Sequence, residues 1–65
     1  MGARALVTTS IPPGGLGEVR LPARGGGTDT YGAYASVLGV RIPAGTRVVV
    51  VEVHPPRTLV VTPDG

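Results

Sequence analysis

Thr46-Arg-Val-Val-Val-Val-Glu-Val53 and Arg57-Thr-Leu-Val-Val-Thr62 are the two runs that decide the fold of this chain. Both are rich in β-branched residues, which fit the pleated, half-buried surface of a strand. His54-Pro-Pro56 separates the two runs, and the turn Ile42-Pro-Ala-Gly45 precedes the first of them. We interpret the runs as a hairpin that supplies the closing strands of a small β-barrel.

Three further strands are predicted upstream, at residues 5–9, 17–23 and 28–37. The middle one alternates charged and aliphatic residues, which is the period of a half-buried strand. Turn-forming residues separate these strands, with Pro12-Pro-Gly-Gly15 after the first and Gly25-Gly-Gly27 after the second. Because Pro and Gly recur so often, no stretch is long enough for a helical period to develop. The chain is therefore predicted to be all-β.

Length and composition limit what this fold can contain. The chain has 65 residues, which suits one domain, and such a chain buries only about 60% of the surface that it exposes when unfolded. It has no Cys, so neither disulfides nor a thiolate metal site can supplement the core. It also has no Phe or Trp, so the core must be aliphatic. The 11 Gly and 7 Pro punctuate apolar runs, which favours a many-turned β domain over disorder.

The charge and the hydropathy pattern exclude several classes of protein. The net charge of +2 arises from six Arg and four acidic residues, with no Lys, and this excess is too small to indicate a nucleic-acid footprint by itself. No stretch approaches the ~18 apolar residues that a membrane-spanning helix needs, and no signal peptide is recognisable. We expect one soluble domain, either complete in itself or cut from a larger protein.

The third strand is distinguished by its small residues. Tyr31, Ala33 and Ala35 share one face, and Tyr34 lies on the other. Small side chains suit a strand that bends across a narrow barrel, and Gly32 is expected to mark a bend or a bulge.

The four consecutive valines of the fourth strand indicate an irregularity. We expect a β-bulge between Val50 and Val51, because Glu52 needs solvent and Val53 needs the core. The fifth strand alternates regularly between inward and outward residues. The predicted core consists of Leu6, Val19, Leu21, Ala35, Ile42, Val48, Val50, Val53, Leu59 and Val61.

No residues of this chain form a catalytic or metal-binding pattern. The residue types of a nucleophile triad occur at Ser10, Asp29, Ser36, His54 and Asp64. They lack a Gly-x-Ser-x-Gly elbow, and the single His is expected in an exposed turn beside two prolines. One His and four scattered acids do not have the spacing of metal ligands. Pro13-Gly-Gly-Leu-Gly17 lacks the Lys and Ser/Thr of a phosphate loop and is interpreted as a turn. We expect no enzyme activity and no cofactor.

Binding of single-stranded nucleic acid is the main alternative function, because small barrels often bind single strands. Such binding uses aromatic side chains that stack on bases along a basic groove. A spacing of three places Tyr31 and Tyr34 on opposite faces of a strand, so they would not form a shared platform. The arginines lie on different segments, at Arg20, Arg24, Arg41, Arg47 and Arg57. A steep salt dependence of binding would identify this function.

The stretch from Gly14 to Pro63 resembles the C-terminal soluble domain of NfeD-like membrane proteins. The matching segments are Gly15-Leu-Gly-Glu-Val-Arg-Leu21, Tyr34-Ala-Ser36, Ile42-Pro-Ala-Gly-Thr46, Val48-Val-Val-Val-Glu-Val53 and Leu59-Val-Val-Thr-Pro63. The steps I-x-x-G-T-x-V-x-V and L-x-V-x-P recur in that family, and this chain contains both. The resemblance implies a small five-stranded β-barrel of the OB-fold type.

The resemblance also implies a function. It implies a non-catalytic protein-interaction domain of a membrane accessory protein, partnering stomatin- or slipin-like proteins in membrane organisation or quality control. This chain would then be associated with a membrane only through a transmembrane region of its parent protein that it does not contain. The serine-protease-like domain of long family members has no counterpart here, so protease activity is not implied. His54-Pro-Pro56 departs from the small polar or Gly turn expected at that place.

The predicted interaction surface consists of outward-facing residues of the third and fifth strands. Tyr34, Thr58 and Val60 lie on this surface, and the edge of the first strand is expected to be free beside them. Exposed β-branched residues suit strand addition by a partner or self-association. The residues expected to face anionic lipid headgroups, if the domain sits beside a membrane, are Arg41, Arg47 and Arg57.

Overall fold

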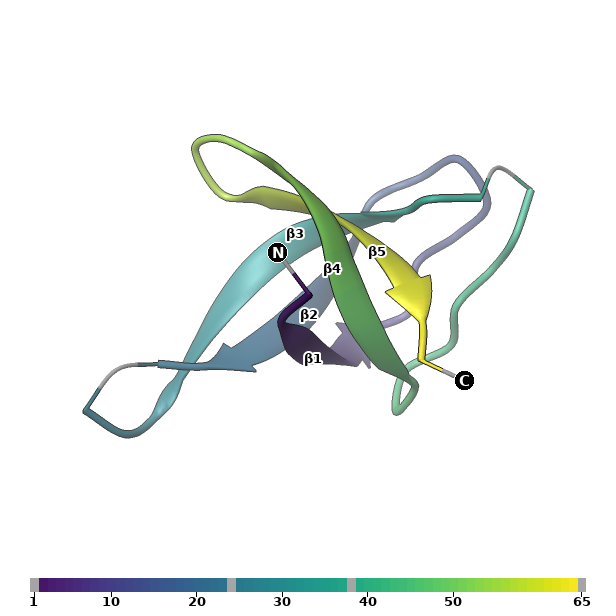
Figure 1. Cartoon of the computed structure of the whole chain (residues 1–65). Coiled ribbons are helices and arrows are strands. Elements are labelled where there is room, and N and C mark those ends of the chain that lie inside the picture. Colours follow the sequence, from purple (N-terminus) through teal and green to yellow (C-terminus); the bar gives the residue numbers. More distant parts are fainter. Residues whose placement is uncertain (1, 24, 38, 65) are drawn as a thin grey trace.

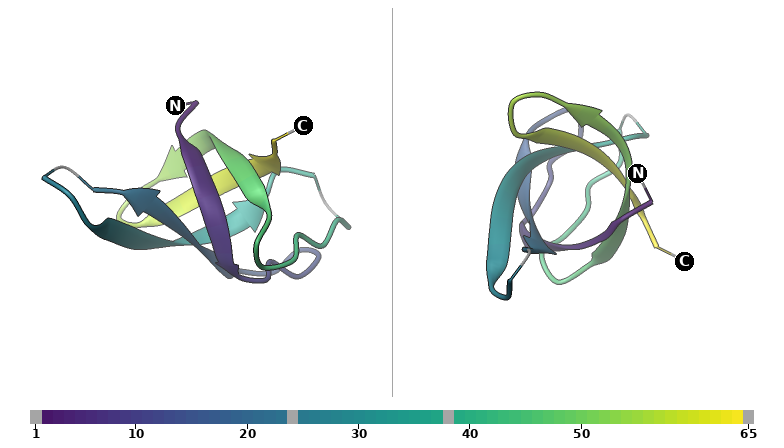
Figure 2. Two further views of the ribbon diagram at one scale, coloured as in Figure 1. Left: turned by 90° about the horizontal axis from the view of Figure 1, so that it is seen from below. Right: turned by 60° about the vertical axis from the view of Figure 1, so that its left-hand side comes forward.

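The five predicted strands all form, with boundaries within two residues of those read from the sequence. The computed structural model describes residues 2–23, 25–37 and 39–64. Its strands are β1 (Arg4–Thr9), β2 (Gly17–Pro22), β3 (Thr28–Ala35), β4 (Arg47–His54) and β5 (Thr58–Pro63). They close into a barrel in the order β1-β2-β3-β5-β4 (Figure 1). A five-stranded all-β barrel is therefore confirmed, and the right-hand view of Figure 2 looks through its ring.

The closure of the barrel depends on one parallel and four antiparallel pairings. β3 and β5 run parallel, and the other neighbouring strands run antiparallel. β1 pairs with β2 on one side and with β4 on the other. The expectation that the edge of the first strand is free is therefore wrong, because closure of the barrel uses both of its edges.

The core is aliphatic, as the composition requires. Its buried members are Ala5, Val7, Ile11, Val19, Ala33, Ile42, Val48, Val50, Leu59 and Val61. Six of the ten predicted core residues are in this set, and predicted Leu21 and Ala35 pack against it while partly exposed. No polar or charged side chain is buried among the described residues. Inside the barrel, the described side chains therefore stabilise the domain by apolar packing, while backbone hydrogen bonds join the strands around it.

The predicted phase of the first strand is wrong. Leu6 is 42% exposed, whereas Ala5 and Val7 are buried. The register explains the difference, because Val7 lies opposite the buried Val19 of β2 and Ala5 lies opposite the buried Val48 of β4. Directly opposed residues in an antiparallel pair point to the same face. The neighbouring strands thus turn Ala5 and Val7 of β1 inward, and the larger Leu6 points outward.

The bulge predicted in the fourth strand is present, but the predicted burial of Val53 is wrong. Val50 lies opposite Val61 and Glu52 lies opposite Val60, so Val51 is the extra residue. Val53 is nevertheless 53% exposed. β1 pairs with β4 only over residues 47–49, so the half of β4 that contains Val53 has only β5 beside it. The bulge places Val53 on the same face as the buried Leu59, which lies opposite it. Val53 stays exposed because no strand covers this half of β4 on its other side.

The face of the third strand is predicted correctly, but its glycine is not a bulge. Ala33 is fully buried, and Tyr31 and Ala35 pack against the core from the same face. The pairing of β3 with β2 runs through Gly32 without a shift in register. A Cβ at Gly32 would lie 3.3 Å from Cδ1 of Leu16. The absence of a side chain at Gly32 therefore leaves space for Leu16, which packs over the strand.

Among residues 2–23, 25–37 and 39–64, there is no helix of the length and apolar character needed to cross a membrane.

Candidate interaction groove and arginine positions

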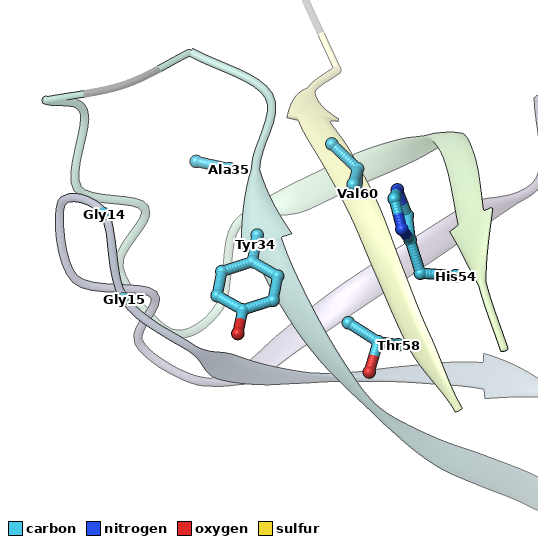
Figure 3. A pocket seen from close by; sticks show the side chains of 7 residues that line it. All are labelled: Gly14, Gly15, Tyr34, Ala35, His54, Thr58 and Val60. Carbon is cyan, nitrogen blue, oxygen red and sulfur yellow. The ribbon is translucent and has the colours of Figure 1, made fainter. Parts of the chain in front are cut away.

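A groove crosses the outer surface of β3 and β5, and we call it the apolar groove. It has a volume of about 320 Å³ and is lined by Gly14, Gly15, Tyr34, Ala35, His54, Thr58 and Val60. Three of the residues predicted for the interaction surface, Tyr34, Thr58 and Val60, thus line one hollow. Figure 3 shows the ring of Tyr34 between the Gly14–Gly15 turn and the side chains of β5.

The parallel pairing of β3 and β5 builds the floor of the apolar groove. Tyr34 lies directly beside Val60 in this pairing, and Gly32 lies beside Thr58. His54, at the end of β4, is opposite Thr58 across the antiparallel pair. The groove therefore has an apolar floor at Tyr34 and Val60 and a polar end at Thr58 and His54.

The wall of the groove comes from the connection between β1 and β2. Residues 12–15 form a turn in which Gly15 N donates to Pro12 O at 3.0 Å, and Gly14 has a φ of 67°. This confirms the interpretation of the Gly-rich segment as a turn between the first two strands. The turn has no charged side chain, so it adds backbone and an apolar surface to the groove.

The three arginines that were expected to face lipid headgroups do not line this groove. Arg57 lies over the ring of Tyr31, with its guanidinium carbon 4.6 Å from the ring centroid, and its Nη2 donates to Thr30 O at 3.3 Å. Arg41 is exposed on the connection between β3 and β4. Arg47 begins β4 and lines a different cleft. The three arginines therefore do not form one patch.

The two tyrosines lie on opposite faces of β3, as predicted. Tyr31 packs against the core and under Arg57, while Tyr34 is 42% exposed in the apolar groove. They cannot stack on successive bases of one strand, because they do not share a surface. Arg24 lies outside the described residues.

The residue types of a nucleophile triad are scattered over the barrel. Ser10 precedes the buried Ile11, Asp29 lies in β3 opposite Leu21, and Asp64 pairs with Arg4. His54 Nε2 lies 3.2 Å from Glu52 Oε1, and both side chains are exposed. Within the described part of the chain, no three His, Asp or Glu residues lie close enough together to hold a metal ion.

Sequence reasoning missed two sets of surface residues. Gly14 and Gly15 reach the apolar groove only because the turn folds back against β3. Arg4 and Arg20 share the second cleft with Arg47. The period of two along β1 places Arg4 and Leu6 on one face, and this was the available signal for part of the cleft. It was missed because Leu6 was predicted to face the core.

Comparison with known proteins agrees with this barrel. The profile of the NfeD C-terminal domain matches residues 4–62, which is nearly the whole chain. The chain belongs to the NfeD C-terminal domain family. Comparison with the curated proteins finds none that matches.

A solved structure supports the same assignment. The NfeD-type domain described above is similar to the solution structure of the soluble domain of the NfeD protein YuaF from Bacillus subtilis, with a TM-score of 0.80 and 35% sequence identity. The match covers 95% of this chain and 70% of that one. The similarity predicted from the I-x-x-G-T-x-V-x-V and L-x-V-x-P steps is therefore confirmed, together with the barrel.

Proposed function

We propose that this NfeD-type domain is a non-catalytic protein-interaction module of a membrane accessory protein, and that its partner is a stomatin- or slipin-like protein. The observation that carries the proposal is the apolar groove. Membership of the NfeD family supports the accessory role, and attachment to a membrane would come from the parent protein.

The groove suits recognition of side chains from a folded or extended partner. Tyr34 and Val60 offer an apolar floor, and Thr58 and His54 offer hydrogen-bonding groups at one end. β3 and β5 already pair with each other at this place, so a partner strand cannot add to them there. A partner would therefore insert an apolar side chain into the groove, as in interfaces where one anchor fills a pocket.

Binding to the soluble part of a slipin-like protein tests this proposal. We expect Tyr34→Ala and Val60→Thr each to weaken binding about tenfold or more, as is typical of central interface residues. Val53→Thr is the matched control, because Val53 is exposed on the neighbouring strand β4 and does not line the groove. Val60→Thr keeps the β-branched shape, and Val60 is only half-buried, so we expect the barrel to remain folded, which circular dichroism of the variant checks.

Two results would contradict the proposal. One is a slipin-like protein that binds the wild-type domain and both groove variants equally well. The other is that the wild-type domain, shown to be folded by its circular dichroism spectrum, binds no slipin-like protein. Self-association through the groove would appear instead as a concentration-dependent mass that Val60→Thr abolishes.

A further inference from the structure

A second cleft lies on the barrel wall where β1 meets β2 and β4, and we call it the arginine cleft. It has a volume of about 390 Å³. Its charged side chains are Arg4 of β1, Arg20 of β2 and Arg47 of β4, and Leu6 of β1 lies among them. Half of the six arginines of the chain therefore line one cleft.

The strand register builds this arrangement. Leu6 lies directly opposite Arg20 on β2 and directly opposite Arg47 on β4. Opposed residues in antiparallel pairs have Cβ atoms about 5 Å apart and point to the same face. Arg4 lies two residues before Leu6, so it shares the outward face of β1. Arg20, Leu6 and Arg47 thus form a row across three strands, with Arg4 beside it.

The positive charge of the cleft is only partly neutralised by the chain itself. Arg4 Nε lies 3.6 Å from Asp64 Oδ2. Glu18, two residues before Arg20 on β2, accepts a hydrogen bond from Thr9 Oγ1 at 3.0 Å. Across residues 2–23, 25–37 and 39–64, neither Arg20 nor Arg47 has an acidic side chain within ion-pair distance. Two guanidinium groups therefore stay available on either side of an exposed leucine.

We propose that the arginine cleft binds the phosphate groups of anionic phospholipids at a membrane surface. Arg20 and Arg47 would each pair with a lipid phosphate, because the planar guanidinium matches phosphate oxygens in a bidentate manner. Leu6, 42% exposed between them, contacts the boundary between headgroups and acyl chains. Amphipathic helices that lie on membranes likewise combine basic and apolar side chains on their surface.

The structure favours a lipid surface over an acidic peptide. A peptide that binds a sheet through backbone hydrogen bonds adds as a strand to a free edge. At the arginine cleft, β1 is paired on both sides, and β2 is paired with β1 and β3. The cleft therefore offers side chains only, with no backbone groups to fix the register of a peptide. Lipid headgroups need no such register.

The structure also favours lipid over single-stranded nucleic acid. Binding of single strands depends on aromatic side chains that stack on the bases. Tyr31 lies under Arg57 and Tyr34 lines the apolar groove, so neither tyrosine lines the arginine cleft. Phosphate contacts alone would remain, and these are the contacts that a phospholipid also provides.

This proposal does not depend on the proposed slipin-like partner. The apolar groove is formed by β3, β5, the end of β4 and the Gly14–Gly15 turn, whereas the arginine cleft is formed by β1, β2, the start of β4 and Thr28, so the two share no lining residue. Variants at one surface can therefore be tested for effects at the other. Loss of partner binding with intact vesicle binding, or the reverse, separates the two proposals.

Co-sedimentation of the 65-residue chain with vesicles tests the proposal. We expect binding at low ionic strength to vesicles that contain phosphatidylglycerol, and little binding to vesicles of phosphatidylcholine alone. Arg20→Gln and Arg47→Gln should each lower the partition coefficient about fivefold, the effect expected of one arginine near an anionic surface. Arg41→Gln removes the same charge from an exposed residue outside the cleft and should have a much smaller effect. Leu6→Gln should weaken binding without changing net charge.

Three results would overturn the proposal. Equal losses for Arg41→Gln and Arg47→Gln would show a nonspecific effect of net charge. Inorganic phosphate that shifts the NMR signals of Arg20 and Arg47 while vesicles do not bind would show a site for free phosphate. Cleft-dependent binding of a poly-glutamate peptide or an oligonucleotide, without vesicle binding, would assign the cleft to a different class of partner. Thermal unfolding of each variant confirms that these surface changes leave the barrel folded.

Discussion

Ile11 and Ile42 exchange both of their backbone hydrogen bonds, at 2.8 Å from Ile11 N to Ile42 O and 2.9 Å from Ile42 N to Ile11 O. Ile11 belongs to the connection between β1 and β2, and Ile42 to the connection between β3 and β4. Both side chains are fully buried. This isolated bridge therefore fastens the two long connections to each other and to the core of the barrel.

Ile42→Ala should destabilise the domain severely. Truncation of a fully buried Ile typically costs about 2–5 kcal/mol, and small domains have only about 5–15 kcal/mol in total. Val40→Ala, on the same connection but exposed, should change the free energy of unfolding by less than about 0.5 kcal/mol. Urea denaturation followed by circular dichroism measures both. A similar loss at both positions would mean that Ile42 does not anchor the connection.

Val50→Asp and Val51→Asp should differ sharply although the two residues are adjacent. Val50 is buried, whereas Val51 is the extra residue of the β4 bulge and is 41% exposed. A buried carboxylate without a partner is strongly unfavourable, so Val50→Asp should abolish folding. Val51→Asp should retain a native spectrum. If the native spectrum survives in Val50→Asp, Val50 does not face the core and the register of β4 is wrong.

Val7→Thr and Leu6→Thr test the inward face of β1. Thr has nearly the shape of Val, but its hydroxyl would be buried without a partner at residue 7, at a cost of about 1–3 kcal/mol. Leu6 is exposed, so Leu6→Thr should shift the unfolding midpoint little. If Leu6→Thr were the more destabilising variant, Leu6 would face the core, as the sequence alone suggests, and the register of β1 would be wrong. Thermal melts of the two variants under one buffer give the comparison.

Gly17→Ala and Gly32→Ala should have effects of different size. A Cβ at Gly17 would lie 2.7 Å from Ser10 O and 2.8 Å from Ile11 Cα, which are backbone atoms. The turn would have to shift, so we expect a loss of about 2 kcal/mol or more from overpacking. At Gly32 the new Cβ meets only the exposed side chain of Leu16, which can move. Gly32→Ala should therefore be neutral, or stabilising by about 0.5–1 kcal/mol, because Ala loses less conformational freedom. Chemical denaturation ranks the pair.

Arg57 and Tyr31 should show a measurable coupling. The guanidinium lies over the ring at 4.6 Å, and such contacts at exposed sites contribute about 0.5–1 kcal/mol. A double-mutant cycle with Arg57→Gln and Tyr31→Leu isolates this energy from the separate hydrogen bond to Thr30. A coupling energy of zero would mean that Arg57 remains solvated and free to contact a partner.

The sequence was most informative where the pattern was local. The alternation in β5 correctly placed Leu59 and Val61 inward, and the run of valines in β4 correctly predicted a bulge at Val51. Turn residues marked every connection between strands. These features follow from the period of two within a strand and from the backbone preferences of Pro and Gly, which act over a few residues.

The predictions that failed depend on contacts between distant segments. The phase of β1 was ambiguous because its short run offers apolar residues to both faces, and its partners β2 and β4 decide which face is buried. Val53 has the correct phase but lies beyond the residues that β1 covers. Neither outcome is visible in the alternation of a single strand.

The candidate surfaces divide in the same way. Tyr34, Thr58 and Val60 were predicted to face outward, and the parallel pairing of β3 with β5 brings them into one groove. The arginine cleft was not predicted, because Arg20, Leu6 and Arg47 become neighbours only through the register of three strands. By itself, the sequence determined the number of strands, their turns and the family. Only the tertiary structure decided which outward residues meet, because closure of the barrel places strands far apart in the chain side by side.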